Sequence, residues 1–442
     1  MQFFQVHTYT SPKPRMILPK SFQTKNVNVT TIHFGKRQVE ATCLFHQDEN
    51  DAIYLSTSVL RHFNLTHQNQ LYAIIRDHLM ELFYPFGVFT AGLDRKDSFF
   101  HSHQPLIKEM IQTGNDLGFH TFFFGYQDVD PETNTIHGLS WGNQQWTSAF
   151  YPIPTAIYNR IPNRKVETHS KVQATKKFLQ TRSLMFNPDF FNKWQIYDIL
   201  IKHAKSNYLL PYTILHPSIA TIQEWADQKP FYLKPVHGSK GDGIYFIRPS
   251  GDRICVKHYE QSRQYEKYYQ DIESLQQSLF PNGFSAFVLQ EGINVMRVGG
   301  QPIDFRIHTN KDATNQWQVS FICVKHATNE AFTTHVNKGG HFLTLADVFT
   351  KQEVTRVEQK LINVTLMISN ILERQLQGPI GELGFDIGID QEQKLWLFEV
   401  NAKPGWSVLQ EAEFRHDASK IFSYLYQYAS HLIKQHSFIL KK

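Results

Sequence analysis

The feature that most constrains the fold is a pair of alternating segments near residue 390. Residues 384–389 read GFDIGI and residues 395–401 read LWLFEVN, with a polar turn between them. Alternation of polar and apolar residues is typical of strands that bury one face. If the turn is centred between residues 392 and 393, the two segments pair as an antiparallel hairpin. The expected cross-strand pairs are Gly384 with Asn401, Phe385 with Val400, Asp386 with Glu399, Ile387 with Phe398, Gly388 with Leu397 and Ile389 with Trp396.

This register places Asp386, Glu399 and Asn401 on one polar face and leaves the other face wholly apolar. Two carboxylates directly opposite each other repel unless a cation lies between them. Oxygen ligands without nearby His or Cys favour magnesium over zinc. We therefore predict a magnesium site, beside which Gly384 and Gly388 would leave room for a bulky ligand such as a polyphosphate. The alternative is an ordinary solvated face; we prefer the metal site because Asn and Gly, which are poor strand formers, gather there.

Composition and charge limit the classes of protein to consider. The chain has 442 residues, enough for two to four structural units, and is 41% hydrophobic and 19% charged, as in globular proteins. Its net charge of +5 is small for this length. We therefore expect no polybasic surface for nucleic acid, although a mildly basic protein suits an anionic substrate.

The cysteines and the apolar segments bear on the cellular compartment. Cys43, Cys255 and Cys323 are far apart and form no CxxC pair, which favours reduced thiols in a cytoplasmic protein. No run of eighteen apolar residues occurs, and the first residues contain no continuous apolar stretch. We therefore expect neither a signal peptide nor a membrane-spanning helix.

The first part of the chain is predicted to contain two units. Residues 1–75 carry short alternating strands, which indicates a small β-rich unit. From residue 76 to residue 165 the pattern changes to a strand at 87–89, a helix at about 104–117 and a strand at 120–124. This order is typical of a small α/β unit.

A glycine-rich segment opens the main part of the remaining chain. Lys234 ends a predicted strand, the sequence HGSKGDG follows at 237–243, and another strand begins at residue 244. Backbone N–H groups approach phosphates closely where there is no Cβ, and a lysine supplies a point charge. The segment is not a Walker loop, because it lacks GxxxxGK[ST] and a strand follows it. Taken alone, a hairpin with a glycine-rich turn explains the pattern equally well.

Further polar residues follow at the ends and edges of predicted strands. Gln290–Gly292 ends a buried strand, and Arg306 and Lys325 would bring cations onto an antiparallel pair of strands at 302–308 and 317–326. A second glycine-containing polar loop, NKGG, begins at Asn337. Solvated sheet edges would explain any one of these features but explain the whole set poorly.

Taken in order, these segments resemble the ATP-grasp superfamily over roughly residues 165–410. The matching elements are Lys234-Pro235 with its glycine loop, Gln290-Glu291, Asp304-Phe305-Arg306, Asn337-Lys338-Gly339-Gly340, and Asp386 followed thirteen residues later by Glu399-Val400-Asn401. Within the superfamily the chain resembles the endospore coat-associated YheC/YheD group. That resemblance is carried by YNRIPNR at 158–164, FNP at 186–188 with NKW at 192–194, YLLPYT at 208–213 and the loop at 234–243.

The resemblance implies an α+β ATP-grasp fold in which two α+β subdomains clasp ATP. The ATP-grasp domain would span residues 166–442, with a nucleotide lid subdomain at about 190–292 and a catalytic metal subdomain at about 293–442. It would follow an α/β pre-ATP-grasp domain at 76–165 and the β-rich unit at 1–75.

The resemblance also assigns roles to individual residues. Lys193 and Lys234 would hold the ATP phosphates beneath a lid formed by the loop that contains Gly238, Ser239, Gly241 and Gly243. Backbone groups of Gln290, Glu291 and Gly292 would bind adenine. Asp386, Glu399 and Asn401 would hold one or two magnesium ions, with manganese as the alternative cation. Arg306, supported by Asn337, would face the γ-phosphate and the acyl phosphate.

The resemblance leaves the ribose contact unassigned and gives Lys403 two alternative roles. Asn294 and Arg297 stand where the family usually has an acidic contact to ribose, so the ribose-binding residue is not identified. Lys403 would lie on the acceptor side and orient the acyl phosphate; the alternative is a surface lysine on a Pro-Gly turn.

The function that the resemblance implies is carboxylate–amine ligation. ATP would phosphorylate a substrate carboxylate, and an amine would displace the phosphate to give an amide. The substrates would be a peptide or a coat component. The protein would act in the cytoplasm of the mother cell of a spore former, or in the spore coat. The alternatives are a kinase on the same scaffold and a non-catalytic structural or nucleotide-sensing coat protein. Retention of the candidate phosphate and metal residues argues against a decayed site.

Overall fold

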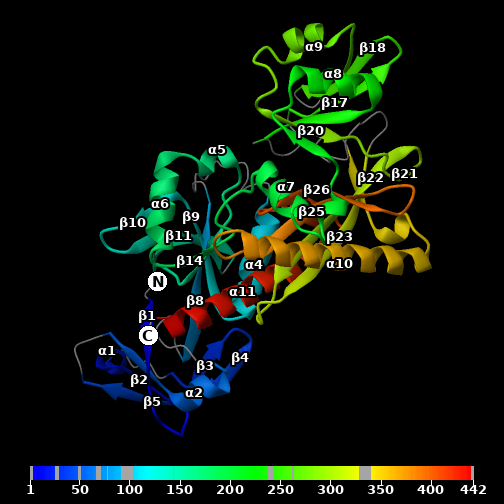
Figure 1. The fold of residues 1–442 in the computed structure, drawn as a ribbon. Helices are drawn as coiled ribbons and strands as arrows, with labels where there is room; N and C mark the ends of the chain where they lie inside the picture. Colours follow the sequence, from blue (N-terminus) through cyan, green and yellow to red (C-terminus); the bar gives the residue numbers. More distant parts are fainter. Residues whose placement is uncertain are drawn as a thin grey trace.

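The computed structural model describes residues 3–24, 29–47, 51–65, 71–76, 78–90, 103–142, 144–236, 243–260, 263–327 and 340–439. Strands form three sheets, and helices pack against them, as expected for an α+β protein (Figure 1). The three cysteines are free, in agreement with the sequence. Among the described helices, none combines the length and the apolar character needed to cross a membrane.

The first sheet has fourteen strands and extends through the N-terminal part of the chain (Figure 1). Its strands are β1 (Phe4–Tyr9), β2 (Arg15–Pro19), β3 (Thr31–Phe34), β4 (Arg37–Glu40), β5 (Thr42–His46), β6 (Ile53–Ser56), β7 (Tyr72–Arg76), β8 (Leu79–Phe89), β9 (Phe119–Phe124), β10 (Val129–Asp130), β11 (Thr135–Gly142), β12 (Gln145–Pro152), β13 (Ala156–Asn159) and β14 (Leu184–Phe186). Its helical segments are α1 (Lys20–Thr24), α2 (Thr57–His62), α4 (Gln104–Asp116), η1 (Tyr126–Asp128), α5 (Arg164–Glu167) and α6 (Ser170–Gln180).

The predicted strand–helix–strand pattern is present at β8, α4 and β9. The two strands pair in parallel, from Tyr84 opposite Phe119 to Phe89 opposite Phe124, with α4 as the crossover helix. β8 also pairs with β7, so the sheet continues across residue 75. The β-rich segment and the α/β segment therefore share one sheet, and their division into separate units stays a prediction.

The second sheet has six strands in the order β15-β20-β16-β17-β18-β19 and lies at the top of Figure 1. Its strands are β15 (Thr213–Leu215), β16 (Phe231–Pro235), β17 (Tyr245–Ser250), β18 (Arg253–Glu260), β19 (Arg263–Tyr269) and β20 (Phe287–Glu291). The helical segments near it in the chain are α7 (Lys193–Ile201), η2 (Asn207–Leu209), α8 (Ile219–Gln228) and α9 (Ile272–Leu279). Buried residues of α8 and α9 join those of the sheet in one core.

The third sheet follows the order β24-β23-β22-β25-β26, with β21 paired to β22. Its elements are β21 (Arg297–Val298), β22 (Gln301–Lys311), β23 (Trp317–His326), β24 (His341–Leu343), η4 (Leu345–Asp347), α10 (Lys351–Gln375), β25 (Glu382–Ile389), β26 (Leu395–Asn401), η5 (Ser407–Gln410) and α11 (Asp417–Ile439). Apolar residues of α10 share a core with β22, β25 and β26. α11 contacts β22 and β23 as well as α4 and β13, so it connects the third sheet to the first (Figure 1).

The predicted hairpin is formed by β25 and β26, but its register is only half right. Gly384 lies opposite Asn401, and Asp386 lies opposite Glu399, as expected. Beyond Asp386 the register shifts by one, so that Ile387 faces Leu397. Phe398 is the extra residue of a β-bulge, which pure alternation cannot predict. The predicted pairs that involve Ile387, Gly388 and Ile389 are therefore wrong.

The role predicted for the two glycines of this hairpin is also wrong. A Cβ on Gly388 would lie 2.6 Å from the ring of Phe398, and a Cβ on Gly384 would lie 2.5 Å from Pro404 Cβ. The space that the absent side chains leave is therefore filled by this chain rather than kept for a polyphosphate. These glycines allow Phe398 and Pro404 to approach the β25–β26 hairpin closely.

Candidate functional site

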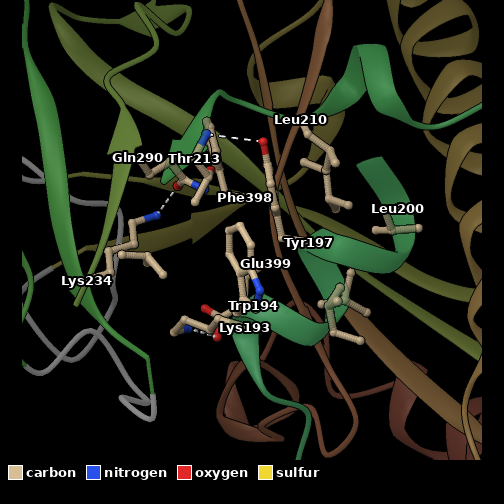
Figure 2. A pocket seen from close by; sticks show the side chains of 14 residues that line it. Lys193, Trp194, Tyr197, Leu200, Leu210, Thr213, Lys234, Gln290, Phe398 and Glu399 are labelled. Atoms are coloured by element: carbon tan, nitrogen blue, oxygen red, sulfur yellow. Dashed lines mark hydrogen bonds and ion pairs between the residues drawn. The ribbon is translucent and has the colours of Figure 1, made fainter. Parts of the chain in front are cut away.

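Two adjoining cavities lie between the second and third sheets. We call the first the α7 cavity because α7 lines one side of it, together with Leu210, β15 and β26 (Figure 2). The second is the β22 cavity, which β16, β20, β22 and β25 line. The residues common to both are Lys193, Lys234, Gln290, Phe398 and Glu399. Most of the predicted site residues within the described structure thus line one continuous cleft.

The buried carboxylate of Asp386 is neutralised by two cations. Its Oδ1 atom lies 3.2 Å from Arg306 Nε and 2.8 Å from Lys325 Nζ. Lys325 Nζ also lies 3.0 Å from Asp304 Oδ1. Arg306 is directly opposite Asp386 on β22, as a cross-strand partner should be. Arg306 and Asp386, to which the resemblance gives separate roles at one site, are therefore direct neighbours in the structure.

Sequence reasoning placed Lys325 on this sheet but gave neither it nor Asp304 a role at the site. Lys325 sits opposite Asp304 on the neighbouring strand, and its side chain, only 4% exposed, reaches over to Asp386 on β25. The available signal was the pairing of the two predicted strands. Had those strands been paired in register, both residues would have fallen on the polar face.

The second predicted metal carboxylate, Glu399, forms an ion pair with Lys193 (Figure 2). Lys193 is the first residue of α7, and the preceding Asn192 caps this helix by accepting from the N–H groups of Trp194 and Gln195. The cap fixes where the helix begins and so fixes the point from which Lys193 projects. The pair is partly exposed, with 20% of the Lys193 side chain and 23% of the Glu399 side chain accessible.

Lys234 donates a hydrogen bond to the Gln290 amide oxygen at the wall between the two cavities (Figure 2). Burial, and then the nearby charge of Lys193, lower the pKa of Lys234 to about 8. An anion close to Lys234 would stabilise the charged form of its ammonium. The convergence of Lys193 and Lys234 on one cleft therefore suits a phosphate chain.

The predicted adenine-binding strand end, Gln290–Gly292, borders the β22 cavity. The N–H of Glu291 donates to the Tyr212 carbonyl over 2.9 Å, and the N–H of Gly292 donates to the Pro230 carbonyl over 3.0 Å. A Cβ on Gly292 would lie 2.8 Å from that same carbonyl oxygen, which explains the need for glycine. The two N–H groups are therefore engaged within the protein. The adenine-binding role of the segment stays a prediction.

Several predicted residues lie outside the described residues, namely Gly238, Ser239, Gly241 and Asn337. Gly243 is described and has a φ of +71°, a conformation that favours glycine. Of the lid predicted for residues 238–243, only Gly243 therefore lies within the described residues.

The donor set on the hairpin fits a hard cation. Asp386 and Glu399 face each other, and Asn401 ends β26 one alternate position further along the same face. No group of three His, Cys, Asp or Glu side chains placed to hold a metal is found in the described parts of the chain. The candidate ligands are accordingly two carboxylates and an amide, which is the oxygen chemistry that magnesium prefers.

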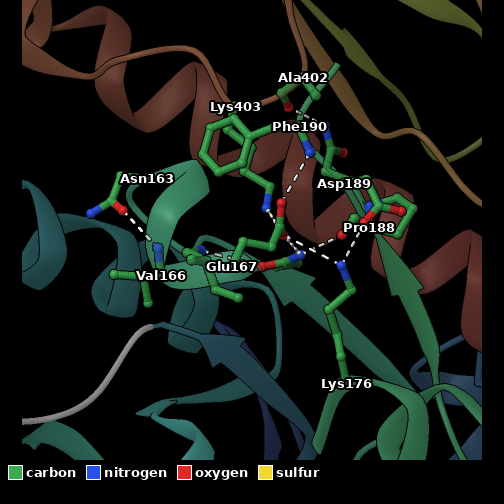
Figure 3. A network of polar contacts seen from close by, with 12 residues as sticks. Asn163, Val166, Glu167, Lys176, Pro188, Asp189, Phe190, Ala402 and Lys403 are labelled. Carbon is green, nitrogen blue, oxygen red and sulfur yellow. Dashed lines mark hydrogen bonds and ion pairs between the residues drawn. The ribbon is translucent and has the colours of Figure 1, made fainter. Parts of the chain in front are cut away.

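Lys403 does not lie on the surface, so that alternative is wrong. Its side chain is 2% exposed, and its ammonium lies 2.6 Å from Glu167 Oε1 (Figure 3). Burial lowers the pKa of Lys403 to about 8, although Glu167 opposes this effect. The sequence KPG is typical of an exposed turn, and nothing local reveals a partner 236 residues earlier in the chain. A catalytic role for Lys403 would require its release from this contact, and that role stays a prediction.

The chain is similar to known proteins along much of its length. A family model for YheC/D-like ATP-grasp proteins matches residues 182–432. The chain is 32% identical to the endospore coat-associated protein YheD of Bacillus subtilis (strain 168), over 94% of this chain and 93% of that protein. It is 23% identical to the endospore coat-associated protein YheC of the same strain, over 67% of this chain and 84% of that protein.

A solved structure, D-alanyl-alanine synthetase A from Vibrio cholerae O1 biovar eltor str. N16961, is similar at a TM-score of 0.49 and 13% identity, over 79% of this chain and 98% of that chain. The resemblance expected from the sequence is confirmed by the family match and by the relative of 32% identity. The chain belongs to the YheC/D-like ATP-grasp family, and its fold is the α+β ATP-grasp fold.

Proposed function

We propose that this protein is an ATP- and magnesium-dependent carboxylate–amine ligase that works through an acyl phosphate. The observation that carries the proposal is the meeting of Lys193 and Lys234 with Asp386 and Glu399 in one cleft. Two lysines at the walls suit a phosphate chain, and two opposed carboxylates suit a divalent cation. Phosphoryl transfer depends mainly on positioning the reacting groups and neutralising their charge, and the residues of this cleft would serve both needs.

The ion pairs in the cleft imply an exchange of partners when the nucleotide binds. Lys193 would leave Glu399 for a phosphate oxygen, and Glu399, with Asp386 and Asn401, would then hold the cation. Bound magnesium would neutralise charge on the phosphate oxygens. Arg306 and Lys325 would remain beside Asp386, where they face the negative charge that develops on the transferred phosphoryl group.

Adenine recognition would fall to the β22 cavity. Tyr232, Ile303 and Phe398 line it, and the strand end at Glu291 and Ile293 borders it. Because the N–H groups of Glu291 and Gly292 donate within the protein, adenine would depend on carbonyl oxygens of this segment or on the N–H of Ile293.

The substrates are proposed from the relatives. Two relatives carry endospore coat-associated names, which supports a peptide or a coat component as the carboxylate or the amine. The same names support a place in the mother-cell cytoplasm of a spore former or in the spore coat.

Calorimetric titration of ATP with magnesium into the full chain tests the nucleotide site. We expect binding that needs the metal and is lost in Glu399→Gln and Asp386→Ala. The matched control is Glu273→Gln, which alters an exposed carboxylate on α9. Absence of binding at millimolar ATP would refute the nucleotide site and favour a structural coat protein, whereas equal binding in Glu399→Gln would refute the metal assignment of Glu399.

The reaction is tested by trapping with hydroxylamine. A ligase supplied with ATP, magnesium and a panel of carboxylates should form a hydroxamate from its acyl phosphate. Release of ADP with a phosphorylated product and no hydroxamate would instead identify a kinase.

A further inference from the structure

The loop that follows the metal strand is held on both sides by buried polar side chains. We call residues 402–407 the acceptor loop. The Asn187 amide donates to the Ala402 carbonyl, and the Arg160 guanidinium donates to the Pro404 carbonyl over 2.7 Å. Both donors come from the segment that contains β13 and β14. The acceptor loop is therefore anchored to the first sheet directly after the last candidate metal ligand.

Between these two anchors, Lys403 is anchored by Glu167 at the end of α5 (Figure 3). Glu167 Oε1 also accepts from Asn159 Nδ2 over 2.9 Å and lies 3.5 Å from Lys176 Nζ. Both members of the Glu167–Lys403 pair are almost fully buried, with side chains 5% and 2% exposed. Removing one partner would leave an unpaired buried charge, so the contact is held firmly.

The other oxygen of the same carboxylate binds a different part of the site. Glu167 Oε2 accepts from the Phe190 backbone N–H over 3.1 Å. Phe190 lies three residues before Lys193, the candidate phosphate lysine. The backbone carbonyl of the following residue, Phe191, accepts from the guanidinium of Arg164, which lies on the same short helix as Glu167. One turn of helix thus holds the segment that leads to Lys193.

We infer that Glu167 is a positioning residue that aligns the Lys193 segment with the acceptor loop. This inference rests on the proposed function, in which Lys193 holds phosphate and the acceptor loop lies beside the acyl group. A carboxylate suits the task because its two oxygens accept in two directions at once. A glutamine has one acceptor oxygen and cannot serve Phe190 and Lys403 in the same way.

The test compares Glu167→Gln with Val172→Ala in the full chain. Val172 is a buried apolar residue of α6, so its truncation lowers stability close to Glu167 without touching either segment. ADP release with hydroxylamine and the carboxylate panel should fall by about 10- to 100-fold in Glu167→Gln, since small misplacements of reacting groups cost this much. The Kd for ATP with magnesium should rise by less than about tenfold, because Lys193 is loosened but keeps its charge, and the other cleft residues are intact. Val172→Ala should leave both quantities near those of the unmodified protein.

Hydrogen exchange provides a readout that does not need turnover. Amides of residues 190–193, 403 and 405–407 should exchange faster in Glu167→Gln than in Val172→Ala. Equal exchange and equal ADP release in the two variants would overturn the inference. If the unmodified protein binds no ATP, the proposed function fails, and faster exchange in both segments would still support the alignment by Glu167, whereas unchanged exchange would refute it.

Discussion

The two proposed metal carboxylates should differ strongly in what they contribute to stability. Asp386 is 6% exposed and meets Lys325, which is 4% exposed, and Arg306. Breaking a buried pair of this kind costs roughly 3–5 kcal/mol, because a buried charge is left without its partner. Asp304 still pairs with Lys325 after the change, so we expect about 3 kcal/mol for Asp386→Asn, the lower end of that range.

Glu399 gives the opposite expectation. Its pair with Lys193 is about one-fifth exposed on each side. Water screens such a pair, which makes it worth about 0.5 kcal/mol. Lys193 can also turn towards solvent when Glu399 loses its charge. Glu399→Gln should therefore be nearly as stable as the unmodified protein while losing metal-dependent ATP binding.

Thermal melting without nucleotide, followed by circular dichroism, measures this contrast. We expect a fall in melting temperature of about 3 °C for Asp386→Asn and of about 0.5 °C for Glu399→Gln. Equal shifts, or a larger shift for Glu399→Gln, would refute the reasoning from burial. The contrast also decides how binding experiments are interpreted. Loss of binding in Glu399→Gln reports on the metal site, whereas loss in Asp386→Ala reports on the site only at temperatures where that variant is folded.

Three further outcomes are expected. Lys234→Ala should weaken ATP binding by roughly 10- to 100-fold, the cost of losing one charged hydrogen bond, and unchanged affinity by calorimetry would mean that the loop after Lys234 is only a hairpin turn. The Lys234 pKa of about 8 lies below its ordinary value of 10.5, and a bound phosphate should raise it again. ATP binding should therefore take up protons above pH 8 and should weaken as the pH rises through 8. Calorimetry in two buffers of different ionisation enthalpy measures this uptake, and no uptake would contradict the reasoning. Asn187→Ala should lower the melting temperature markedly, because the amide bonds to backbone groups of Gly381, Glu382 and Ala402 and because the residue has a φ of +53°; a shift below about 2 °C would contradict this.

Alternation along the sequence was enough to predict which two carboxylates share the polar face of the hairpin. It placed Asp386 opposite Glu399 and put Phe385 and Val400 on the buried side of the same hairpin, because both consequences depend only on a period of two. It failed beyond Asp386, since a β-bulge adds one residue without changing the composition of the strand. The bulge matters for the site because it lets Phe398 line both cavities next to Glu399.

Pairing between distant strands was harder to predict. Lys325 was expected on the sheet, yet its contact with Asp386 spans two strand intervals, from β23 over β22 to β25. Single-strand periodicity gives the face on which a residue lies but not the neighbour that it reaches. The carboxylates of the cleft are therefore neutralised by cations whose contacts the sequence pattern did not predict.

Lys403 shows most clearly what local sequence reasoning lacks. A lysine before Pro-Gly is exposed in most proteins, and an ammonium is rarely buried unless it is paired. Its partner Glu167 lies on a short helix next to the first sheet, and only the folded chain brings the two together. A buried lysine with a single close carboxylate is costly to maintain, so its presence directly after β26 calls for a reason beyond stability. The alignment of the acceptor loop with the Lys193 segment supplies that reason, because the same Glu167 carboxylate binds both.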